Sequence, residues 1–358
     1  MKNSNNNTIS SRYKIGLNDE GPHTNKTYIM REWWYYNAIF NHPKSELKNW
    51  FTLLSISSNL HSDSIKLLLH DDKNKNYGGL YDKPKGETQA KGPGVNVNFD
   101  KCNIKGIYPK WNLHFENTGL DNKEIVADLE YKATKHPIWL LRNTGHNIST
   151  SRYGYYFIMN CDVEGKITID NTKYDVKGTG YYDHTWSPIY KKKDKTLDSK
   201  IKKFKIDVYV WDWIFFHLEN GWNIFIGKIH FGKRNLFSSL MPGTLNIVSK
   251  ENDMMESYFF PITYKNFQKT SNPNLKIPKE INIKSMKINP LNKNPIKGPL
   301  FLDLNYKTEN IKEFLFGDPP QWGIWDSSGK VLGRIRGFRK EIELKGLGIM
   351  EYTNNVKF

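Results

Sequence analysis

The sequence has 358 residues, and its 53 lysines and arginines outnumber its 37 aspartates and glutamates, for a formal charge of +16. This length allows two domains with their own cores, and the charge admits nucleic acid, anionic membrane or acidic ligands as partners. Two cysteines, Cys102 and Cys161, are too few for a disulfide scaffold and too far apart for a zinc knuckle. The polar N-terminus does not resemble a signal peptide and no run of ~18 apolar residues occurs, so we expect a cytoplasmic protein.

Residues 1–18 are rich in Asn and Ser and are predicted to form a disordered tail. A first domain is predicted over residues 19–190, where short apolar runs alternate with turn-forming residues and no apolar 3.6-residue period appears. Residues 73–94, which are rich in Gly, Lys, Pro and Asp, are predicted to form a long loop, and 162–165 a turn. The predicted strands of this domain are 30–40, 50–58, 65–69, 95–99, 104–108, 111–115, 125–131, 153–161, 166–170 and 174–182.

A basic linker is predicted over residues 191–203, because the lysine-rich sequence there has few apolar residues. Two interpretations stay open for it. It is either a solvated connection or a patch that binds anionic lipid headgroups, which would make the protein peripheral to a membrane. No helix-turn-helix, RRM or zinc-finger pattern is present, so we expect no nucleic-acid partner.

The second domain, predicted over residues 204–358, opens with two apolar runs around Asn220-Gly221, the strongest short signal for a β-hairpin. Side chains alternate between the two faces of a strand, so the even positions of 204–218 share one face. All of them are apolar except Asp212. Burial on that face would raise the pKa of the Asp212 carboxyl toward that of a usable proton donor. Further strands are predicted at 257–264, 323–325, 331–337 and 345–352.

Four motifs follow one another along the chain: Arg31-Glu32-Trp33-Trp34-Tyr35, then Gly180-Tyr181-Tyr182-Asp183-His184-Thr185-Trp186, then Trp211-Asp212-Trp213 with Asn220-Gly221-Trp222, and finally Gly346-Leu347-Gly348-Ile349-Met350-Glu351-Tyr352. In this order they resemble the two-domain lipocalin-like family that includes carotenoid 1,2-hydratase, kievitone hydratase and the AttH proteins, with the fungal Diels-Alderases as distant relatives. Two departures are Ser187, where the family usually has Gly, and the basic insert of residues 189–203.

The resemblance implies an all-β fold of two consecutive lipocalin-like β-barrel or β-sandwich domains and a hydrophobic, isoprenoid- or polyketide-like ligand. It also implies that the DHxW segment and the acidic residue on the following strand protonate a double bond. By motif, these are Asp183, His184 and Trp186, together with Asp212.

Hydration of an alkene needs an acid that can protonate carbon and a surface that tolerates the resulting cation. A neutral carboxylic acid in an apolar lumen supplies the first, and indole rings supply the second through cation–π attraction. We therefore predict Asp212, His184 and Asp183 as catalytic residues. The predicted ligand-binding residues are Trp33, Trp34, Tyr35, Tyr182, Trp186, Trp211 and Trp213.

Each of these residues also has a purely structural interpretation, with Asp212 hydrogen-bonded to a neighbour, His184 a satisfied interior histidine and the tryptophans core packing. Strand alternation places Tyr182, His184 and Trp186 on one face, and Tyr181 and Asp183 on the other. Glu32 is expected to pair with Arg31, or with Arg334 or Arg336.

We expect no metal, because the histidines lack HxH or HExxH spacing, and no nucleotide cofactor, because no phosphate-binding glycine motif is present. The favoured hypothesis is a cofactor-free enzyme that hydrates, isomerises or cyclises a hydrophobic unsaturated molecule. Two alternatives stay open: a carrier that binds an apolar ligand unchanged, and a pericyclase that acts through shape alone.

Overall fold

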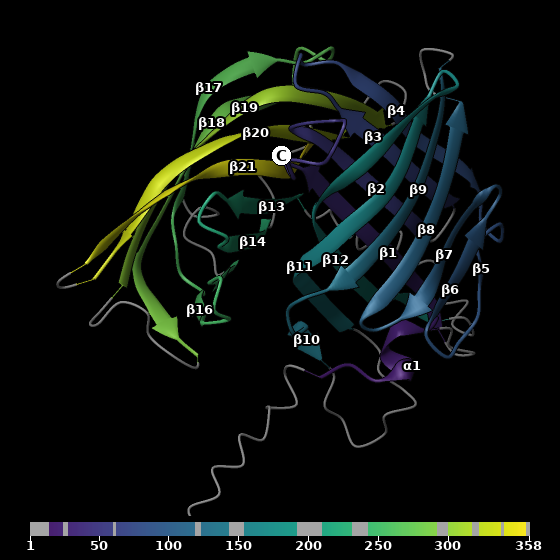
Figure 1. Cartoon of the computed structure of the whole chain (residues 1–358), viewed down its shortest axis with the longest axis horizontal. Helices are drawn as coiled ribbons and strands as arrows, with labels where there is room; N and C mark the ends of the chain where they lie inside the picture. The colour runs from purple at the N-terminus through teal and green to yellow at the C-terminus, as the bar shows by residue number, and fades with distance from the viewer. Residues whose placement is uncertain are drawn as a thin grey trace, which may run out of the picture. The chain divides into compact units, whose positions relative to one another are not determined.

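The structure is a computed structural model and describes residues 14–23, 28–59, 62–118, 123–142, 154–191, 210–230, 243–291, 300–316, 322–337 and 340–355. Nearly all of them lie in two large antiparallel sheets (Figure 1). The described chain contains one helix, α1 (Leu17–Glu20), which is far too short to cross a membrane, and it contains no longer helix that could. The prediction of an all-β protein is confirmed.

The described residues form two compact units, each with its own apolar core. The first unit holds the described residues up to Leu69 and from Tyr77 to Lys191. The second holds His70–Asn76 and the described residues from Val210 onward.

The first sheet has the strand order β4-β3-β2-β1-β12-β11-β9-β8-β7-β6-β5, with β10 paired to β11. Its first strand in sequence, β1, therefore pairs with its last, β12. The strands are β1 (Tyr28–Phe40), β2 (Trp50–Ser58), β3 (Ser62–His70), β4 (Asn76–Pro84), β5 (Gln89–Ala90), β6 (Val95–Phe99), β7 (Cys102–Ile107), β8 (Lys110–Thr118), β9 (Glu124–Ala133), β10 (Ile138–Arg142), β11 (Gly154–Ile169) and β12 (Thr172–Lys191).

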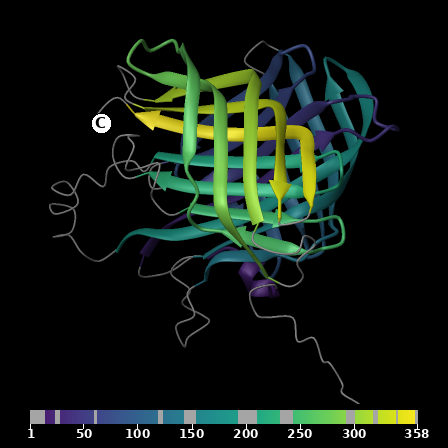
Figure 2. The same cartoon turned by 90° about the vertical axis from the view of Figure 1, so that its left-hand side faces the viewer.

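The second sheet, drawn from green to yellow in Figure 2, has the order β16-β15-β14-β13-β21-β20-β19-β18-β17. An additional pairing joins β16, at one end of this path, to β18, the strand next to the other end, so the sheet closes on itself. The strands are β13 (Val210–Leu218), β14 (Asn223–His230), β15 (Gly243–Val248), β16 (Met254–Ser257), β17 (Ile262–Lys269), β18 (Lys276–Pro290), β19 (Leu300–Phe316), β20 (Trp322–Arg336) and β21 (Glu341–Asn355).

Large aromatic side chains fill the core of the first unit. Because each buried aromatic ring removes roughly 150–250 Å² from water, a few of them account for much of the apolar burial. The fully buried tryptophans and tyrosines in this core are Trp34, Tyr36, Trp111, Tyr131, Tyr156, Tyr182 and Trp186.

The predicted β-hairpin of the second domain forms from β13 and β14, and its residues before Val210 lie outside the described residues. Gly221 has a φ of 80°, which glycine adopts without strain. The Gly221 N–H donates to the Leu218 carbonyl, and the Leu218 N–H donates to the Trp222 carbonyl. The turn is therefore three residues long, Glu219–Gly221, and only its glycine has positive φ.

Three predictions, about one loop, one turn and one strand, were wrong. The long loop at 73–94 contains β4 and β5, the turn at 162–165 lies inside β11, and the strand at 257–264 is interrupted between β16 and β17. β4 lies at the edge of its sheet, where charged residues and proline are normal, so its sequence resembles a loop.

The structure also orders residues that the sequence assigned to the tail and to the linker. Leu17 begins α1, and the Lys14 carbonyl accepts a hydrogen bond of 2.7 Å from Trp139 Nε1. β12 extends through Lys191. The rest of the predicted linker, 192–203, lies outside the described residues.

Candidate active site

The pairing of β1 with β12 positions the two best-defined motifs beside each other. In this register Glu32 lies opposite Trp186, and Trp34 lies opposite His184. The predicted alternation along β12 is confirmed, because Tyr182 and Trp186 lie in the core, whereas Tyr181 donates a hydrogen bond of 2.9 Å to Asp183 on the other face. Asp183 and His184 therefore project to opposite faces of the sheet and cannot act on the same substrate atom.

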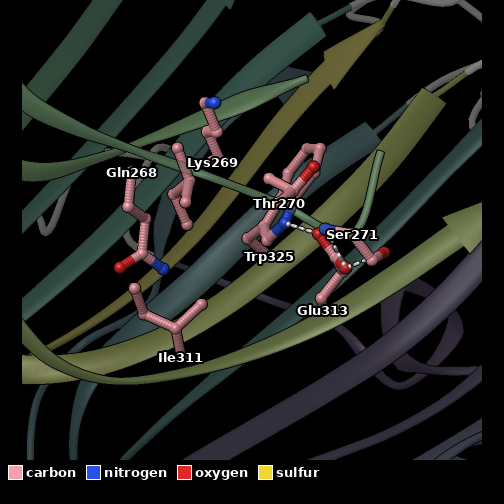
Figure 3. Close-up of a pocket in the computed structure, with 8 residues that line it drawn as sticks. Gln268, Lys269, Thr270, Ser271, Ile311, Glu313 and Trp325 are labelled. Carbon is pink, nitrogen blue, oxygen red and sulfur yellow. Dashed lines mark hydrogen bonds between the residues drawn. The ribbon is translucent and has the colours of Figure 1, made fainter. Parts of the chain in front are cut away.

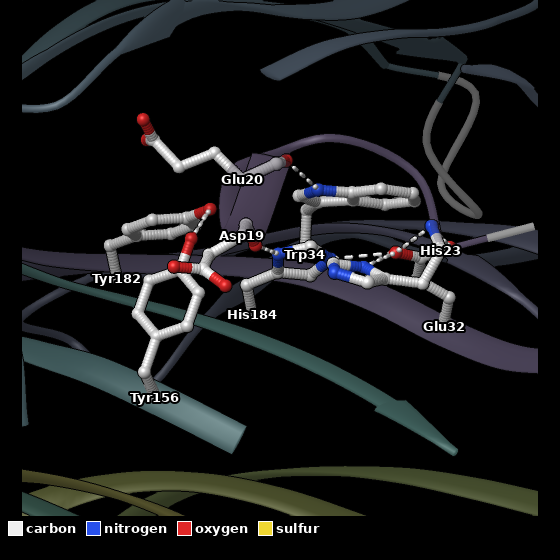
Figure 4. Close-up of polar contacts among 8 residues, drawn as sticks. All are labelled: Asp19, Glu20, His23, Glu32, Trp34, Tyr156, Tyr182 and His184. Carbon is white, nitrogen blue, oxygen red and sulfur yellow. Dashed lines mark hydrogen bonds and ion pairs between the residues drawn. The ribbon is translucent and has the colours of Figure 1, made fainter. Parts of the chain in front are cut away.

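The Glu32 carboxylate lies between two histidines (Figure 4). Its Oε1 is 2.8 Å from Nε2 of His184 and 2.9 Å from Nδ1 of His23, and the His23 backbone N–H donates to both carboxylate oxygens at 3.1 Å. The expectation that Glu32 pairs with an arginine was wrong. Arg31 is its neighbour on the strand and lies on the opposite face, while the histidines reach Glu32 from the chain after α1 and from β12.

The second ring nitrogen of His184, Nδ1, lies 3.0 Å from the Asp19 carbonyl and donates to it. Burial, the largest effect, disfavours the Glu32 carboxylate, but hydrogen bonds from His184 and His23 outweigh it, and the pKa of Glu32 falls below its ordinary value. Burial also lowers the pKa of His184, against the attraction of Glu32. A neutral His184 has one N–H for two acceptors, and with Nδ1–H donated to the Asp19 carbonyl its Nε2 faces the Glu32 oxygen without a proton of its own.

Aromatic rings enclose this histidine–glutamate cluster. The His23 ring stacks on Trp186 with centroids 3.5 Å apart, and the Trp34 ring stacks on His184 at 4.9 Å. Of the predicted ligand-binding residues, Trp34, Tyr182 and Trp186 thus gather around His184 as packed core. Tyr35 lies on the other face of the sheet, with Tyr181.

Asp212 occupies the core face of the second sheet, as the alternation along β13 predicted. Its neighbours Ile214 and Phe216 on that face belong to the second core, and the Asp212 side chain is 0% exposed. On the other face of β13, Trp213 and Phe215 are buried as well.

Asp212 has partners that the sequence did not indicate. Its Oδ2 lies 2.7 Å from Nε2 of His230, which is also fully buried, and accepts a hydrogen bond from the hydroxyl of Tyr264. Lys228 lies directly opposite Asp212 on β14, and its ammonium donates to the Phe260 carbonyl at 3.2 Å. Asp212 is therefore not an isolated carboxyl group, because a histidine and a tyrosine contact it and a lysine lies opposite it in the sheet.

The remaining predicted residues do not join either cluster. Trp33 and Trp211 are half-buried, and Trp211 Nε1 donates to Glu351 at 2.7 Å. Trp213 packs against Phe225. His184 and Asp212 lie in different units, each with its own partners.

His23, His230 and Tyr264 are the residues that the sequence analysis missed. For His230 a signal existed. If the two strands are paired outward from the Asn-Gly turn, Asp212 lies opposite Lys228, and His230 lies diagonally across from Asp212. No local signal marks His23, since its role depends on the strand pairing of distant segments.

A pocket of about 190 Å³ opens in the second unit, with Trp325 and Glu313 in its wall (Figure 3). Trp325 Nε1 donates to Glu313 at 2.7 Å. The pocket does not include Asp212, but a row of rings leads from one to the other: Trp325 lies 6.0 Å from Tyr352, and Tyr352 lies 6.0 Å from Tyr264.

Comparison with known proteins finds similarity at the level of structure. No family model matches the sequence, and no curated protein matches it either. A candidate AttH protein from Nitrosomonas europaea superposes with a TM-score of 0.62 at 13% identity, covering 97% of this chain and 99% of that one. Kievitone hydratase from Nectria haematococca gives 0.61 at 14% identity, covering 96% and 94%. CghA gives 0.52 at 10% identity, covering 92% and 89%. Over nearly its whole length, the chain has the two-domain lipocalin-like fold of these proteins.

Proposed function

We propose that the protein is an enzyme that hydrates, isomerises or cyclises an apolar unsaturated molecule by proton transfer at the Asp212, His230 and Tyr264 cluster. One observation carries the proposal. A fully buried carboxylate and imidazole, 2.7 Å apart, contact the hydroxyl of a half-buried tyrosine on the apolar face of the second sheet. Buried acid–base groups at an apolar surface are typical of catalytic sites.

Tyr264 is the member of the cluster that a substrate can reach, because the Asp212 and His230 side chains are fully buried. Its hydroxyl lies 3.4 Å from Nε2 of His230 and donates to Asp212. Tyr264 is thus the proton donor to the substrate, and the Asp212 and His230 pair positions its hydroxyl and returns a proton to it.

For a hydration, the proton passes from Tyr264 to one alkene carbon and leaves a cation on the other. Water adds to that cation, and the proton lost by the added water returns to the cluster, so the net change is one water added. The ring of Trp325, which lies in the pocket wall, is suited to the cationic intermediate, since a desolvated cation–π contact contributes roughly 2 kcal/mol. The name kievitone hydratase, carried by a protein of the same fold, supports this class of reaction.

The test is incubation with a panel of prenylated phenols, linear isoprenoids and polyenes in D₂O, followed by mass spectrometry of the products. We expect deuterium at carbon in the product of the wild-type chain. Tyr264→Phe removes the proton donor, so turnover should fall by about 10²–10⁴. The control Tyr306→Phe removes a buried hydroxyl of the same core that does not touch the cluster, and it should retain turnover.

The alternatives give different results. A carrier would bind members of the panel and release them unchanged and free of deuterium. A pericyclase would form product without solvent deuterium, at equal rates in the wild-type chain and in Tyr264→Phe. Either result would reject the proposal.

A further inference from the structure

The histidine–glutamate cluster of the first unit is arranged around a single point. One donor atom from each of His23, Glu32 and His184 lies within 4.8 Å of the other two. The residues come from three parts of the chain, the segment after α1, β1 and β12, so spacing along the sequence could not indicate the group. Two imidazoles and a carboxylate are a frequent ligand set for divalent transition metals.

The hydrogen bond of His184 to Asp19 determines which electron pairs face this point. With Nδ1–H donated to the Asp19 carbonyl, Nε2 of His184 presents a lone pair to the Glu32 oxygen 2.8 Å away. Nδ1 of His23 faces the same oxygen at 2.9 Å. One proton can lie between only two of these three atoms, whereas a metal ion binds all three at once.

We propose that His23, Glu32 and His184 bind one divalent transition metal ion of the zinc type. Nitrogen donors favour Zn²⁺, Co²⁺ or Ni²⁺ over Mg²⁺ and Ca²⁺, which prefer oxygen ligands. The Glu32 oxygen and each nitrogen, 2.8–2.9 Å apart, are close enough for an ion to bind both at about 2.0–2.2 Å.

The surroundings of the three ligands support a metal site. Ligating histidines almost always donate their other ring N–H to a carbonyl or carboxylate, as His184 does to Asp19. Glu32 is held by the His23 backbone N–H, and Trp186 and Trp34 fix the two imidazole rings by stacking. The His23 side chain is 12% exposed, which leaves a path for the ion.

A metal at this position would fasten the segment of α1 to the first sheet. His23 follows α1, whereas Glu32 and His184 lie on the paired strands β1 and β12. The ion would therefore stabilise the folded chain, because it binds the folded chain and not the unfolded one.

The experiment uses the full chain without a histidine tag, stripped with a chelator and then dialysed against Zn²⁺ or Co²⁺. We expect one equivalent of zinc by elemental analysis, a visible Co²⁺ spectrum of nitrogen and oxygen ligands, and a higher melting temperature with zinc. His23→Ala removes the most exposed ligand and should weaken zinc binding by more than ~100-fold, the upper range for loss of a supporting residue.

His114→Ala is the matched control. It also removes a histidine that contacts a carboxylate, Asp128 at 2.6 Å, but none of the described residues supplies a third ligand there. This variant should bind zinc as the wild-type chain does. The proposal is overturned if the stripped wild-type chain gains neither zinc nor thermal stability, or if His23→Ala and His114→Ala bind zinc equally. Because no substrate enters the experiment, its result is independent of the proposed catalytic function.

Discussion

Glu20 is a carboxyl group buried at the end of α1, where it accepts hydrogen bonds of 2.9 Å from Trp111 Nε1 and from the Tyr108 N–H. Burial, the largest effect, raises its pKa to about 7 in spite of these bonds. The ionisable groups whose charges interact with Glu20 are Asp19, Tyr36, Tyr108, Tyr156 and Tyr182.

This raised pKa predicts that the first unit loses stability as the pH rises. The folded chain holds the Glu20 proton more tightly than the unfolded chain, so the stabilisation is complete below pH 4.5 and is lost as the pH rises through 7. The loss is at most about 3 kcal/mol. In urea unfolding, the free energy of unfolding of the wild-type chain should be lower at pH 8 than at pH 5. The difference between the two pH values should be smaller in Glu20→Gln. Exposed Glu164→Gln, the control, should behave as the wild type does, and an unchanged difference in Glu20→Gln would refute this role of Glu20.

At the scale of single residues, sequence reasoning succeeded where the two-residue period of a strand decided the outcome. The faces of Asp212 and of Tyr182, His184 and Trp186 followed from alternation alone. It failed for the partners of these residues, because a contact such as that of His23 with Glu32 depends on which strands pair and on where α1 lies. Asp212 itself was placed correctly, but its neighbours His230 and Lys228 were not predicted, since both come from the neighbouring strand.

Among the strands, β4 depends on one glycine. Gly78 has a φ of 79°, and a Cβ at this position would lie 2.0 Å from the Leu67 carbonyl oxygen of the neighbouring strand β3. Left-handed strain alone lowers the free energy of unfolding by about 1–3 kcal/mol. We expect Gly78→Ala to lower it by more, because a clash with backbone adds to the strain.

A second glycine serves to separate the effect of the clash at Gly78 from the effect of left-handed strain alone. Gly86 also has positive φ, 116°, but an added Cβ there meets no atom within 4 Å. Thermal unfolding should therefore show a larger drop for Gly78→Ala than for Gly86→Ala, at roughly 2–4 °C per kcal/mol. Equal drops would mean that β3 moves aside without cost.

The predicted elements were most accurate for short strands flanked by turn-forming residues and least accurate at sheet edges and inside long strands. The strands at 50–58 and 95–99 were predicted to the residue. Gly165 was read as part of a turn, yet it lies within β11 between Leu129 of β9 and Val176 of β12, where glycine lets the backbones approach closely. Glycine in a sequence does not distinguish these two uses.

The positive charge of the whole chain, +16, bears on a proposed contact with anionic membrane. The lysine-rich stretch that begins at Lys191 lies outside the described residues from 192 on, so its role stays a prediction. If it docks the protein on lipid, binding to vesicles should rise with anionic lipid and fall with salt. Replacing Lys191, Lys192 and Lys193 by Gln should weaken this binding.

A control variant separates local from overall charge. Lys101, Lys110 and Lys330 each pair with a glutamate on a strand, and replacing them by Gln removes the same three charges. Vesicle sedimentation should show stronger binding for this control than for the variant at 191–193. If both variants bind anionic vesicles equally weakly, the effect is one of net charge. If the wild-type chain binds neutral vesicles as well as anionic ones, the proposed contact is rejected.

The pairing of the first strand of each sheet with its last has a consequence for the order of events during synthesis. β1 leaves the ribosome early but cannot gain its partner β12 until some 150 residues later, when residues 179–191 have been made. In the same way, β13 cannot pair with β21 until the end of the second sheet has been synthesised. Until then, one edge of each of these early strands stays open to other chains. Glu32 and His184 lie on the first of these late pairs, so a nascent chain holds no histidine–glutamate cluster until its first sheet is complete.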